Sequence, residues 1–288
     1  EISIECNPGT LTLNKLLTYR DAGVNRLSIG LQSTNDEELK LLGRIHTYDQ
    51  FVKNYEMARN VGYKNISVDL MYGLPQQTTE KYLDTVNRIV RLKPDHISAY
   101  SLIVEKGTPF YEKYKFDMVK QEAGMRTEFL PNEDELYEME KAGQAQLFDA
   151  GYKQYEISNY AKNNMACRHN IGYWTRENYL GLGIGAASLL DNVRYTNTSD
   201  IDKYLSGCRN IHDMKEDVFR TNLHISADVI DRKAQMEEFM FLGLRMNEGV
   251  TREAFEKSFG ISIDAIYKNI IDDLKNQEIG RASCRERV

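Results

Sequence analysis

The sequence lacks cysteines that are spaced for metal binding or for redox chemistry. Its four cysteines stand far apart, at Cys6, Cys167, Cys208 and Cys284. The ligands of a structural zinc ion and the members of a redox pair come at short, fixed spacings, and a disulfide scaffold needs a denser set. We therefore expect reduced thiols, with neither a structural zinc site nor a disulfide framework.

Long hydrophobic runs and a leader sequence are also missing. No apolar run reaches the about 18 residues that a helix needs to cross a bilayer. The chain begins with Glu1, without an initiator methionine and without a basic stretch followed by an apolar one. These absences predict a cytoplasmic protein with no transmembrane segment.

Positive charge is not in excess either. The formal net charge is -6 at pH 7, which argues against a nucleic-acid partner and favours a small ligand or a protein partner. The chain has 288 residues, 41% of them hydrophobic, which is enough to bury a large core. It therefore predicts one large domain or two smaller ones.

The N-terminal third of the chain alternates between the periods of strands and of helices. The expected strands are Ile2–Cys6, Arg26–Leu31, Asn65–Met71 and His96–Leu102. The expected helices are Leu11–Ala22, Asp36–Leu42, Tyr48–Val61 and Thr79–Leu92. This alternation predicts a parallel sheet, because a parallel neighbour is reached only through a long crossover. In such sheets, ligands bind beyond the carboxyl ends of the strands.

Polar side chains gather at the ends of these expected strands. Glu5 ends the first strand, Gln32 follows the second, and Asp69 interrupts the third, which is otherwise apolar. A buried carboxylate is costly unless a partner or ligand satisfies it, so Asp69 indicates a site; the alternative is a solvent-facing strand end or a turn cap. Glu5 equally suits an N-cap or the surface, and Gln32 a turn hydrogen bond to Ser33. Arg44 supplies a guanidinium suited to a carboxylate or phosphate.

Four of these segments carry a resemblance to a known family. They are Glu5-Cys6-Asn7-Pro8, Gly23-Val24-Asn25-Arg26-Leu27-Ser28-Ile29-Gly30-Leu31-Gln32-Ser33, Leu42-Gly43-Arg44 and Asp69-Leu70-Met71-Tyr72-Gly73-Leu74-Pro75. With them, the chain resembles the radical S-adenosylmethionine (SAM) proteins of the oxygen-independent coproporphyrinogen III oxidase family. Within that family, the segment Arg168–Trp174 is similar to the His-Asn-x-x-Tyr-Trp signature of the HemW heme chaperone branch, which the oxidase branch lacks.

The resemblance implies a fold and a division into domains. The fold is α/β: a partial (β/α)6 TIM-like radical SAM barrel that lacks its first strands, followed by an α+β extension and a helical C-terminal domain. The barrel would occupy residues 1–107, the extension 108–230 and the helical domain 231–280. The octet 281–288 is charged and has no apolar period, so we interpret it as a non-native tail.

The resemblance also implies a SAM site. By position, Glu5, Gln32, Arg44 and Asp69 match the SAM contacts of the family, with Arg44 on the carboxylate, Glu5 on the ammonium, and Gln32 and Asp69 on the ribose. Further SAM contacts are expected at Ile103, Gly183 and Ile184. No catalytic residue is identified.

The iron–sulfur ligands of the family have no counterpart in this sequence. The family holds a [4Fe-4S] cluster with a Cys-x-x-x-Cys-x-x-Cys loop after the first barrel strand, and that spacing does not occur here. The chain is therefore expected to begin at the third strand, with the cluster cysteines upstream. Ile2–Cys6 would then be an exposed sheet edge that is prone to aggregation.

The signature segment offers candidate contacts to heme. His169 suits an axial iron ligand, and Tyr173 and Trp174 offer flat apolar surfaces for a porphyrin. A histidine beside Asn170 equally suits a turn or packing role, and the thiol of Cys167 is a second candidate iron ligand. These residues predict a heme segment without deciding which atom binds.

Two functions follow from the resemblance. The first is a heme chaperone that delivers heme to client hemoproteins such as respiratory enzymes, with SAM and, in the complete protein, a [4Fe-4S] cluster. The alternative is an oxygen-independent coproporphyrinogen III oxidase, which decarboxylates porphyrinogen propionates. The third alternative is that the truncated chain has no activity by itself, and its enzymatic character is left open.

Three further segments carry predictions. Gly181–Ser188 lacks the spacing of a dinucleotide or P-loop motif, so its glycines are expected to allow close backbone approach, to a strand or to the adenosine of SAM. Tyr111–Glu128 is polar enough to predict a mobile, insertion-like connection. Met236, Met240, Met246, Phe239 and Phe241 have the helical spacing of core residues rather than of a heme box.

Overall fold

The computed structural model describes residues 1–162, 164–210 and 223–277. The chain forms two compact units, Glu1–His169 and Asn170–Val288. The domain limits at residues 107 and 230 that the family implies stay a prediction.

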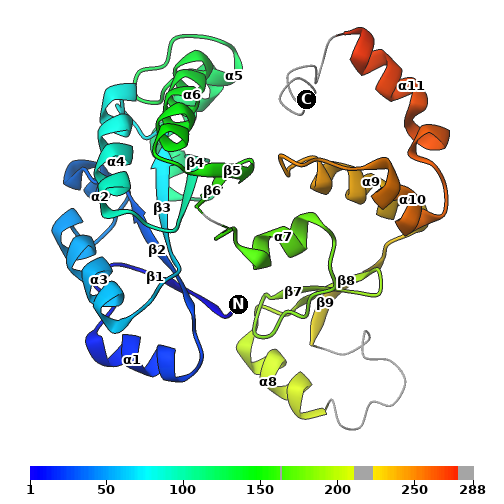
Figure 1. Cartoon of the computed structure of the whole chain (residues 1–288), viewed down its shortest axis with the longest axis horizontal. Coiled ribbons are helices and arrows are strands. Elements are labelled where there is room, and N and C mark those ends of the chain that lie inside the picture. The colour runs from blue at the N-terminus through cyan, green and yellow to red at the C-terminus, as the bar shows by residue number, and fades with distance from the viewer. Residues whose placement is uncertain (163, 211–222, 278–288) are drawn as a thin grey trace. The chain divides into compact units, whose positions relative to one another are not determined.

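The first unit is built on a six-stranded sheet (Figure 1). In the order β1-β2-β3-β4-β6-β5, neighbours from β1 to β4 are parallel, and β6 is antiparallel to both β4 and β5. Within the described residues β1 pairs with β2 alone, so the predicted sheet edge is present. The strands are β1 (Ser3–Cys6), β2 (Arg26–Gln32), β3 (Ile66–Tyr72), β4 (His96–Ser101), β5 (Lys153–Glu156) and β6 (Asn159–Ala161).

Six helices accompany this sheet, and each begins at a polar N-cap whose side chain accepts a backbone N–H of the first turn. In Figure 1 the helices α1, α3, α4 and α6 lie along one side of the strands. The helices are α1 (Leu13–Asp21), α2 (Asp36–Leu41), α3 (Tyr48–Val61), α4 (Thr79–Leu92), α5 (Pro109–Glu122) and α6 (Glu133–Asp149).

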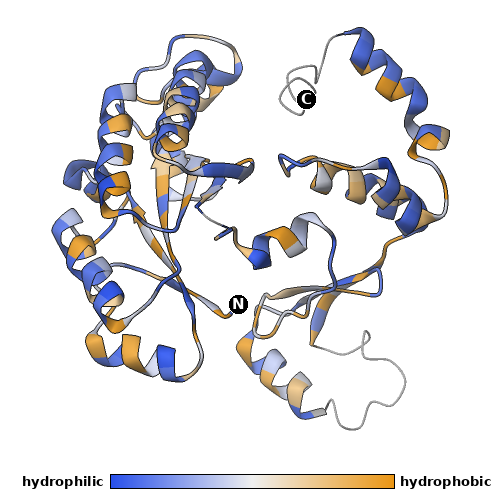
Figure 2. Ribbon diagram, in the orientation of Figure 1, coloured by the Kyte–Doolittle hydropathy of each residue, from blue (hydrophilic) through white to orange (hydrophobic). Residues whose placement is uncertain are grey.

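The eight elements expected in the N-terminal third are all present. Two of them, Tyr48–Val61 and Thr79–Leu92, have the expected bounds, and the other six differ by one or two residues at an end. The core packs between strands and helices, and in Figure 2 apolar and polar bands alternate along α1 and α3 as expected of helices that cover a sheet. Fully buried core residues include Leu16, Leu27, Ile29, Leu31, Phe51, Ile66, Val68, Leu70, Val86, Ile89 and Ile97.

The expected mobile connection over Tyr111–Glu128 is wrong. The segment is mostly the helix α5, which starts with Pro109 in its first turn after the N-cap Thr108. The side chain of Asp117 is buried and accepts hydrogen bonds from the backbone N–H groups of Glu128, Phe129 and Leu130. The polar composition was a misleading signal, because Asp117 is polar but buried, and its hydrogen bonds hold the loop that follows the helix.

Replacing Asp117 with alanine is therefore expected to destabilise the first unit by about 3 kcal/mol, because one buried and two partly buried N–H groups lose their acceptor. Burial alone would raise the pKa of Asp117, but the three N–H donors bring it below its ordinary value. The stabilisation is thus complete above the pKa of an unfolded aspartate and is lost as the pH falls through the lower folded value. Urea unfolding at pH 7 measures the loss. Glu122→Ala, which removes an exposed carboxylate at the end of the same helix, should change the free energy of unfolding by less than about 0.5 kcal/mol. Equal losses in the two variants would contradict the role of Asp117.

The second unit combines a small sheet with helices. The antiparallel sheet has the order β7-β8-β9. Three phenylalanines, Phe239, Phe255 and Phe259, pack ring against ring in its helical part. The elements are α7 (Arg168–Trp174), which spans the boundary between the units, β7 (Ala187–Leu190), β8 (Val193–Asn197), α8 (Ile201–Asn210), β9 (His224–Val229), α9 (Arg232–Gly243), α10 (Arg252–Phe259) and α11 (Ile263–Asn276).

The predicted core role of the methionine and phenylalanine stripe on α9 holds for part of it. Met236, Phe239 and Met240 pack against the buried cluster around Phe255. Phe241 instead has 58% of its surface exposed, so it does not belong to this core. No helix in the described ranges is long and apolar enough to cross a membrane.

A buried carboxylate ties α9 to the sheet of the second unit. Glu238 accepts hydrogen bonds from Arg176 Nε at 2.8 Å and from Arg194 Nη1 at 2.7 Å. Burial alone would raise the pKa of Glu238, but the two guanidinium groups bring it below its ordinary value. One acid therefore pairs with two arginines, one from the turn after α7 and one from β8.

Candidate functional site

The two faces of the parallel sheet differ in polarity. Successive side chains of a strand point to opposite faces, and the alternate residues Leu27, Ile29 and Val68 are fully buried in the core. The other face carries polar groups at registered positions: Glu5 is paired with Ser28, Ser28 with Ser67, and Ser67 with His96. This polar face is where a hydrophilic ligand can be recognised.

Asp69 lies on the polar face, between Gly30 of β2 and Ser98 of β4. Its carboxylate accepts hydrogen bonds from Ser28 Oγ at 3.1 and 3.3 Å and from Ser67 Oγ at 3.5 Å. Burial raises the pKa of Asp69, and the hydroxyl donors oppose that shift. The carboxylate is thus bonded inside the sheet and does not cap the turn that follows β3.

Gln32, Asn7 and Arg44 meet at the ends of β1 and β2. The strand β2 has a register shift between Gly30 and Gln32, and Gln32 has a φ of +76°. Its side-chain oxygen accepts a hydrogen bond from the Tyr100 hydroxyl at 3.0 Å rather than one from Ser33. Arg44 Nη1 donates to Asn7 Oδ1 at 3.0 Å. The bulge turns the Gln32 amide toward Tyr100 of β4, across β3, where it joins the polar face.

Glycine at position 30 makes room for these amides. A Cβ atom there would lie 3.1 Å from Gln32 Nε2 and 3.7 Å from Asn7 Oδ1. Position 30 is also the register partner of Asp69. A larger side chain would crowd the space between the carboxylate and the two amides.

A pocket of about 300 Å³ lies beside this cluster. Arg44 and Ile103 both line it, and Ile103 has 77% of its surface exposed. The structure thus places a guanidinium next to open apolar surface, an arrangement that suits a ligand with a carboxylate and a flat base. The other lining residues are Leu42, Met71, Leu102, Val104, Glu105, Thr108 and Phe110.

Five of the seven predicted SAM contacts therefore lie in the first unit: Glu5, Gln32, Arg44, Asp69 and Ile103. Glu5 is exposed on the edge strand β1, with β2 between it and Asp69 on β3, and its charge helps to raise the pKa of Asp69. Gln32 and Arg44 stand at the strand ends. Gly183 and Ile184 belong to the second unit, and their contact with SAM stays a prediction.

The glycine segment 181–188 serves close backbone approach to a strand. A Cβ atom on Gly181 would lie 2.2 Å from the carbonyl oxygen of Ala187 in β7. Asn197 Nδ2 donates to the carbonyl oxygens of Gly181 and Gly183, at 3.2 and 2.8 Å, and the Gly183 N–H donates to the Tyr204 hydroxyl at 2.8 Å. Strand packing, the first of the two expected reasons for these glycines, is confirmed at Gly181.

The signature segment forms the short helix α7. His169 and Tyr173 are four residues apart in this helix and so share a face. His169 is exposed, and Tyr173 packs edge-on against Tyr179 with ring centroids 4.7 Å apart. One face of Trp174 is covered by the guanidinium of Arg245, 4.3 Å from the ring centroid. The aromatic residue that accompanies His169 on its face is therefore Tyr173.

Cys167 differs from His169 in accessibility. Its side chain is 3% exposed, and its thiol donates to Glu1 Oε1 at 3.7 Å. This environment suits a structural thiol better than an iron ligand.

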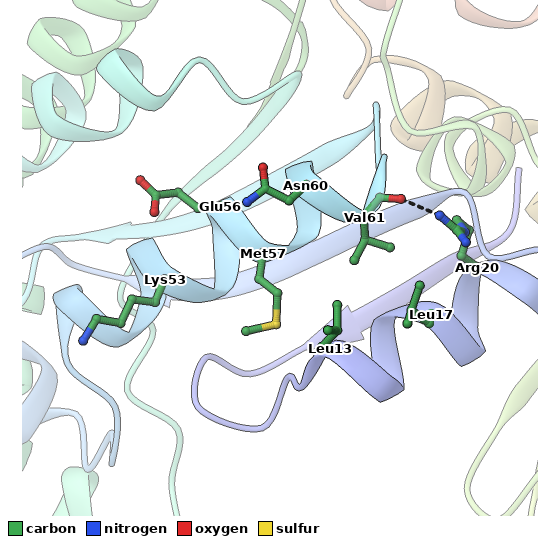
Figure 3. A pocket seen from close by; sticks show the side chains of 8 residues that line it. All are labelled: Leu13, Leu17, Arg20, Lys53, Glu56, Met57, Asn60 and Val61. Carbon is green, nitrogen blue, oxygen red and sulfur yellow. Dashed lines mark hydrogen bonds between the residues drawn. The ribbon is translucent and has the colours of Figure 1, made fainter.

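A second groove, of about 580 Å³, lies between α1 and α3 (Figure 3). It is lined by the aliphatic residues Leu13, Leu17 and Val61, and Arg20 donates to the Val61 carbonyl oxygen at 2.6 Å. It contains none of the predicted site residues and lies in the helix layer, away from the strand ends. The groove is therefore not the candidate site.

Several polar residues of the site were not predicted from the sequence. Ser67 and Asp69 alternate with buried apolar residues in β3, and a period of two in polarity was the signal that could have indicated a polar face. Partners far along the chain carry no such local signal. The residues missed in this way are Asn7, Ser28, Ser67, His96 and Tyr100.

Two family models match the chain. The model of the radical SAM superfamily matches residues 1–89, and that of the HemN C-terminal domain matches residues 230–281. Both matches lie in segments for which the sequence predicted a partial barrel and a helical terminal domain.

Curated relatives match over most of the chain. The heme chaperones HemW of Lactococcus lactis and of Bacillus subtilis are each 35% identical, over 279 and 274 residues, which are 97% and 95% of this chain and 68% of each relative. A mitochondrial radical SAM domain-containing protein 1 of Mus musculus is 39% identical over 186 residues, 65% of this chain and 40% of that protein. The chain thus spans about two thirds of the length of the bacterial relatives.

One solved structure shares the fold over nearly the whole chain. Coproporphyrinogen III oxidase (HemN) from Escherichia coli, described as a radical SAM enzyme, aligns with a TM-score of 0.75 and 21% identity, covering 96% of this chain and 62% of that one. The predicted α/β radical SAM fold is therefore confirmed.

Proposed function

We propose that this chain, which belongs to the HemW/HemN family of radical SAM proteins, is part of a heme chaperone that binds heme and passes it to client hemoproteins such as respiratory enzymes. The observation that carries the proposal is the helix Arg168–Trp174, in which His169 is exposed and shares a face with Tyr173. An imidazole beside a flat aromatic ring suits an iron ligand next to a porphyrin. The relatives whose names describe heme chaperones support this choice.

The polar face of the first unit suits SAM, which membership in the radical SAM superfamily implies. Arg44 would bind the carboxylate of SAM, Glu5 its ammonium, and Gln32 with Asp69 its ribose hydroxyls. The chemistry fits, because a guanidinium pairs with a carboxylate and a carboxylate accepts from an ammonium or a hydroxyl. The exposed Ile103 in the adjacent pocket supplies apolar surface for the adenine.

The superfamily also implies a [4Fe-4S] cluster, which the residues of this chain do not fit. The sequence contains no Cys-x-x-x-Cys-x-x-Cys spacing, and Cys6 is a buried thiol whose pKa burial raises to about 11. A thiol that resists ionisation is a poor iron ligand. No reaction step is therefore assigned to the SAM site.

Replacing His169 with alanine in the full-length protein is expected to abolish the Soret shift that accompanies heme binding, or to weaken heme affinity by about tenfold or more, as for the loss of one metal ligand or its support. Titration of heme followed by absorbance measures this. Cys167→Ala is the matched comparison and should leave the Soret band unchanged. A band that survives in His169→Ala and disappears in Cys167→Ala would make Cys167 the ligand.

The second candidate function is that of a coproporphyrinogen III oxidase, which the shared fold with HemN favours. The two functions separate in one pair of assays on the cluster-loaded full-length protein. Stable heme uptake without conversion of coproporphyrinogen supports the chaperone. Turnover of coproporphyrinogen without heme binding would reverse the choice.

A further inference from the structure

A row of hydrogen bonds crosses the polar face of the first unit. The backbone N–H of Cys167 donates to the Tyr155 hydroxyl at 3.2 Å, and that hydroxyl lies 2.9 Å from His96 Nε2. His96 Nδ1 lies 2.8 Å from Ser67 Oγ, and Ser67 Oγ donates to Asp69 Oδ1 at 3.5 Å. The row connects the residue before the heme helix with a carboxylate of the candidate SAM site.

The chemistry of its two ends fixes the direction of this row. A backbone N–H can only donate, and the carboxylate of Asp69 can only accept when it is ionised, which is the state considered for this row. Burial, assisted by the charge of Arg26, lowers the pKa of His96 to about 3, so its imidazole is neutral at pH 7 and carries one N–H. Tyr155 therefore donates to His96 Nε2, and His96 Nδ1–H donates to Ser67. Every proton of the row points toward Asp69.

The middle of the row is closed to water. Ser67 and His96 each have 0% of their surface exposed, so water does not compete for their bonds. Reversing the two hydrogen bonds of His96 would require its other tautomer and the reorientation of the Tyr155 and Ser67 hydroxyl groups. The weakest link is the 3.5 Å contact at Asp69, the one atom of the row that a ligand hydroxyl would also approach.

We propose that His96 and Tyr155 are positioning residues that couple binding of a nucleoside ligand at Asp69 to the backbone at Cys167. This inference rests on the proposed SAM site, and it goes beyond that site by linking it to the segment that enters the heme helix. Occupancy at Asp69 fixes the acceptor at one end of the row and so strengthens the bond that the Cys167 N–H makes at the other. SAM binding then orders the chain just before His169.

Hydrogen exchange at the Cys167 amide tests this coupling in the cluster-loaded full-length protein. Saturating SAM is expected to slow exchange of that amide by about fivefold or more, the range typical of coupled sites. Tyr155→Phe should remove the response to SAM while calorimetry still shows SAM binding. Tyr152→Phe is the matched control, because its hydroxyl is also buried but donates to the Pro94 carbonyl oxygen outside the row, and it should keep the response.

Two results would overturn the coupling in distinguishable ways. If SAM binds by calorimetry but does not slow exchange at Cys167, or slows it equally in Tyr155→Phe, the coupling is refuted and the SAM site stands. If SAM does not bind at all, both the proposed SAM site and the coupling are refuted. A purely structural role of Tyr155 would change exchange by the same factor with and without SAM, so the difference between the two conditions separates positioning from folding.

Discussion

Replacing Asp69 with asparagine is expected to weaken SAM binding by about 10- to 100-fold, the loss of a hydrogen bond to a charged group worth about 1.5–3 kcal/mol. Asparagine keeps the size of the side chain and one acceptor, but it removes the charge and turns one acceptor into a donor. Calorimetry on the cluster-loaded full-length protein measures the change. The control is Asp84→Asn, which removes an exposed carboxylate that pairs with Arg88 on α4.

The pH dependence gives the same prediction a second readout. Burial raises the pKa of Asp69 above its ordinary value, so the carboxylate is protonated at a higher pH than an exposed aspartate. A ribose hydroxyl then loses a charged acceptor, and SAM affinity should fall as the pH is lowered through this raised value. The Asp69→Asn variant should lack that dependence. Unchanged affinity in Asp69→Asn, together with a pH profile like that of the wild type, would remove Asp69 from the site.

Replacing Glu238 with alanine is expected to destabilise the second unit by about 3 kcal/mol, the cost of leaving the buried charge of Arg176 without its partner. Arg176 has only 9% of its side chain exposed, so its guanidinium cannot recover full hydration when the carboxylate is gone. The adjacent Glu237→Ala is a close control, because Glu237 is half exposed and pairs with Lys233 at 3.7 Å. That surface pair should contribute less than about 1 kcal/mol.

Denaturant unfolding of both variants, followed by a probe in the second unit, checks this prediction. Because the two arginines hold the pKa of Glu238 below its ordinary value against the effect of burial, the stabilisation is present above the pKa of an unfolded glutamate. It is lost as the pH falls through the lower folded value. Equal losses of stability in Glu237→Ala and Glu238→Ala would show that the buried pairs do not hold α9 to the sheet.

Much of the first unit could be predicted because its local signals agree. The helix Tyr48–Val61 starts after Thr47, which forms a capping box with Gln50, and ends at Gly62 in the left-handed conformation. The N-cap, the apolar period and the glycine that ends the helix all lie within one short window of sequence. The helix can therefore be predicted from that window alone. The ends of the strands could be predicted for the same reason, and so could the position of Asp69 near the end of its strand.

The unpredicted parts of the site depend on partners distant in the chain. The contact between His96 and Tyr155 joins residues 59 positions apart, and Arg245 covers Trp174 from another helix end. Periodicity records which face a residue occupies but not what lies opposite it. The helix α5 was missed for a related reason, because its polar composition did not reveal that Asp117 is buried against the next loop.

At Gln32, the stability of the backbone and the recognition of a ligand favour different residues. A non-glycine residue with a φ of +76° pays a conformational cost of about 1–3 kcal/mol, and glycine would relieve it. Glycine would also delete the amide that Tyr100 orients. A change to glycine at position 32 would therefore stabilise the sheet but weaken ligand binding. Selection for a stable fold and selection for ligand binding favour different residues at this position.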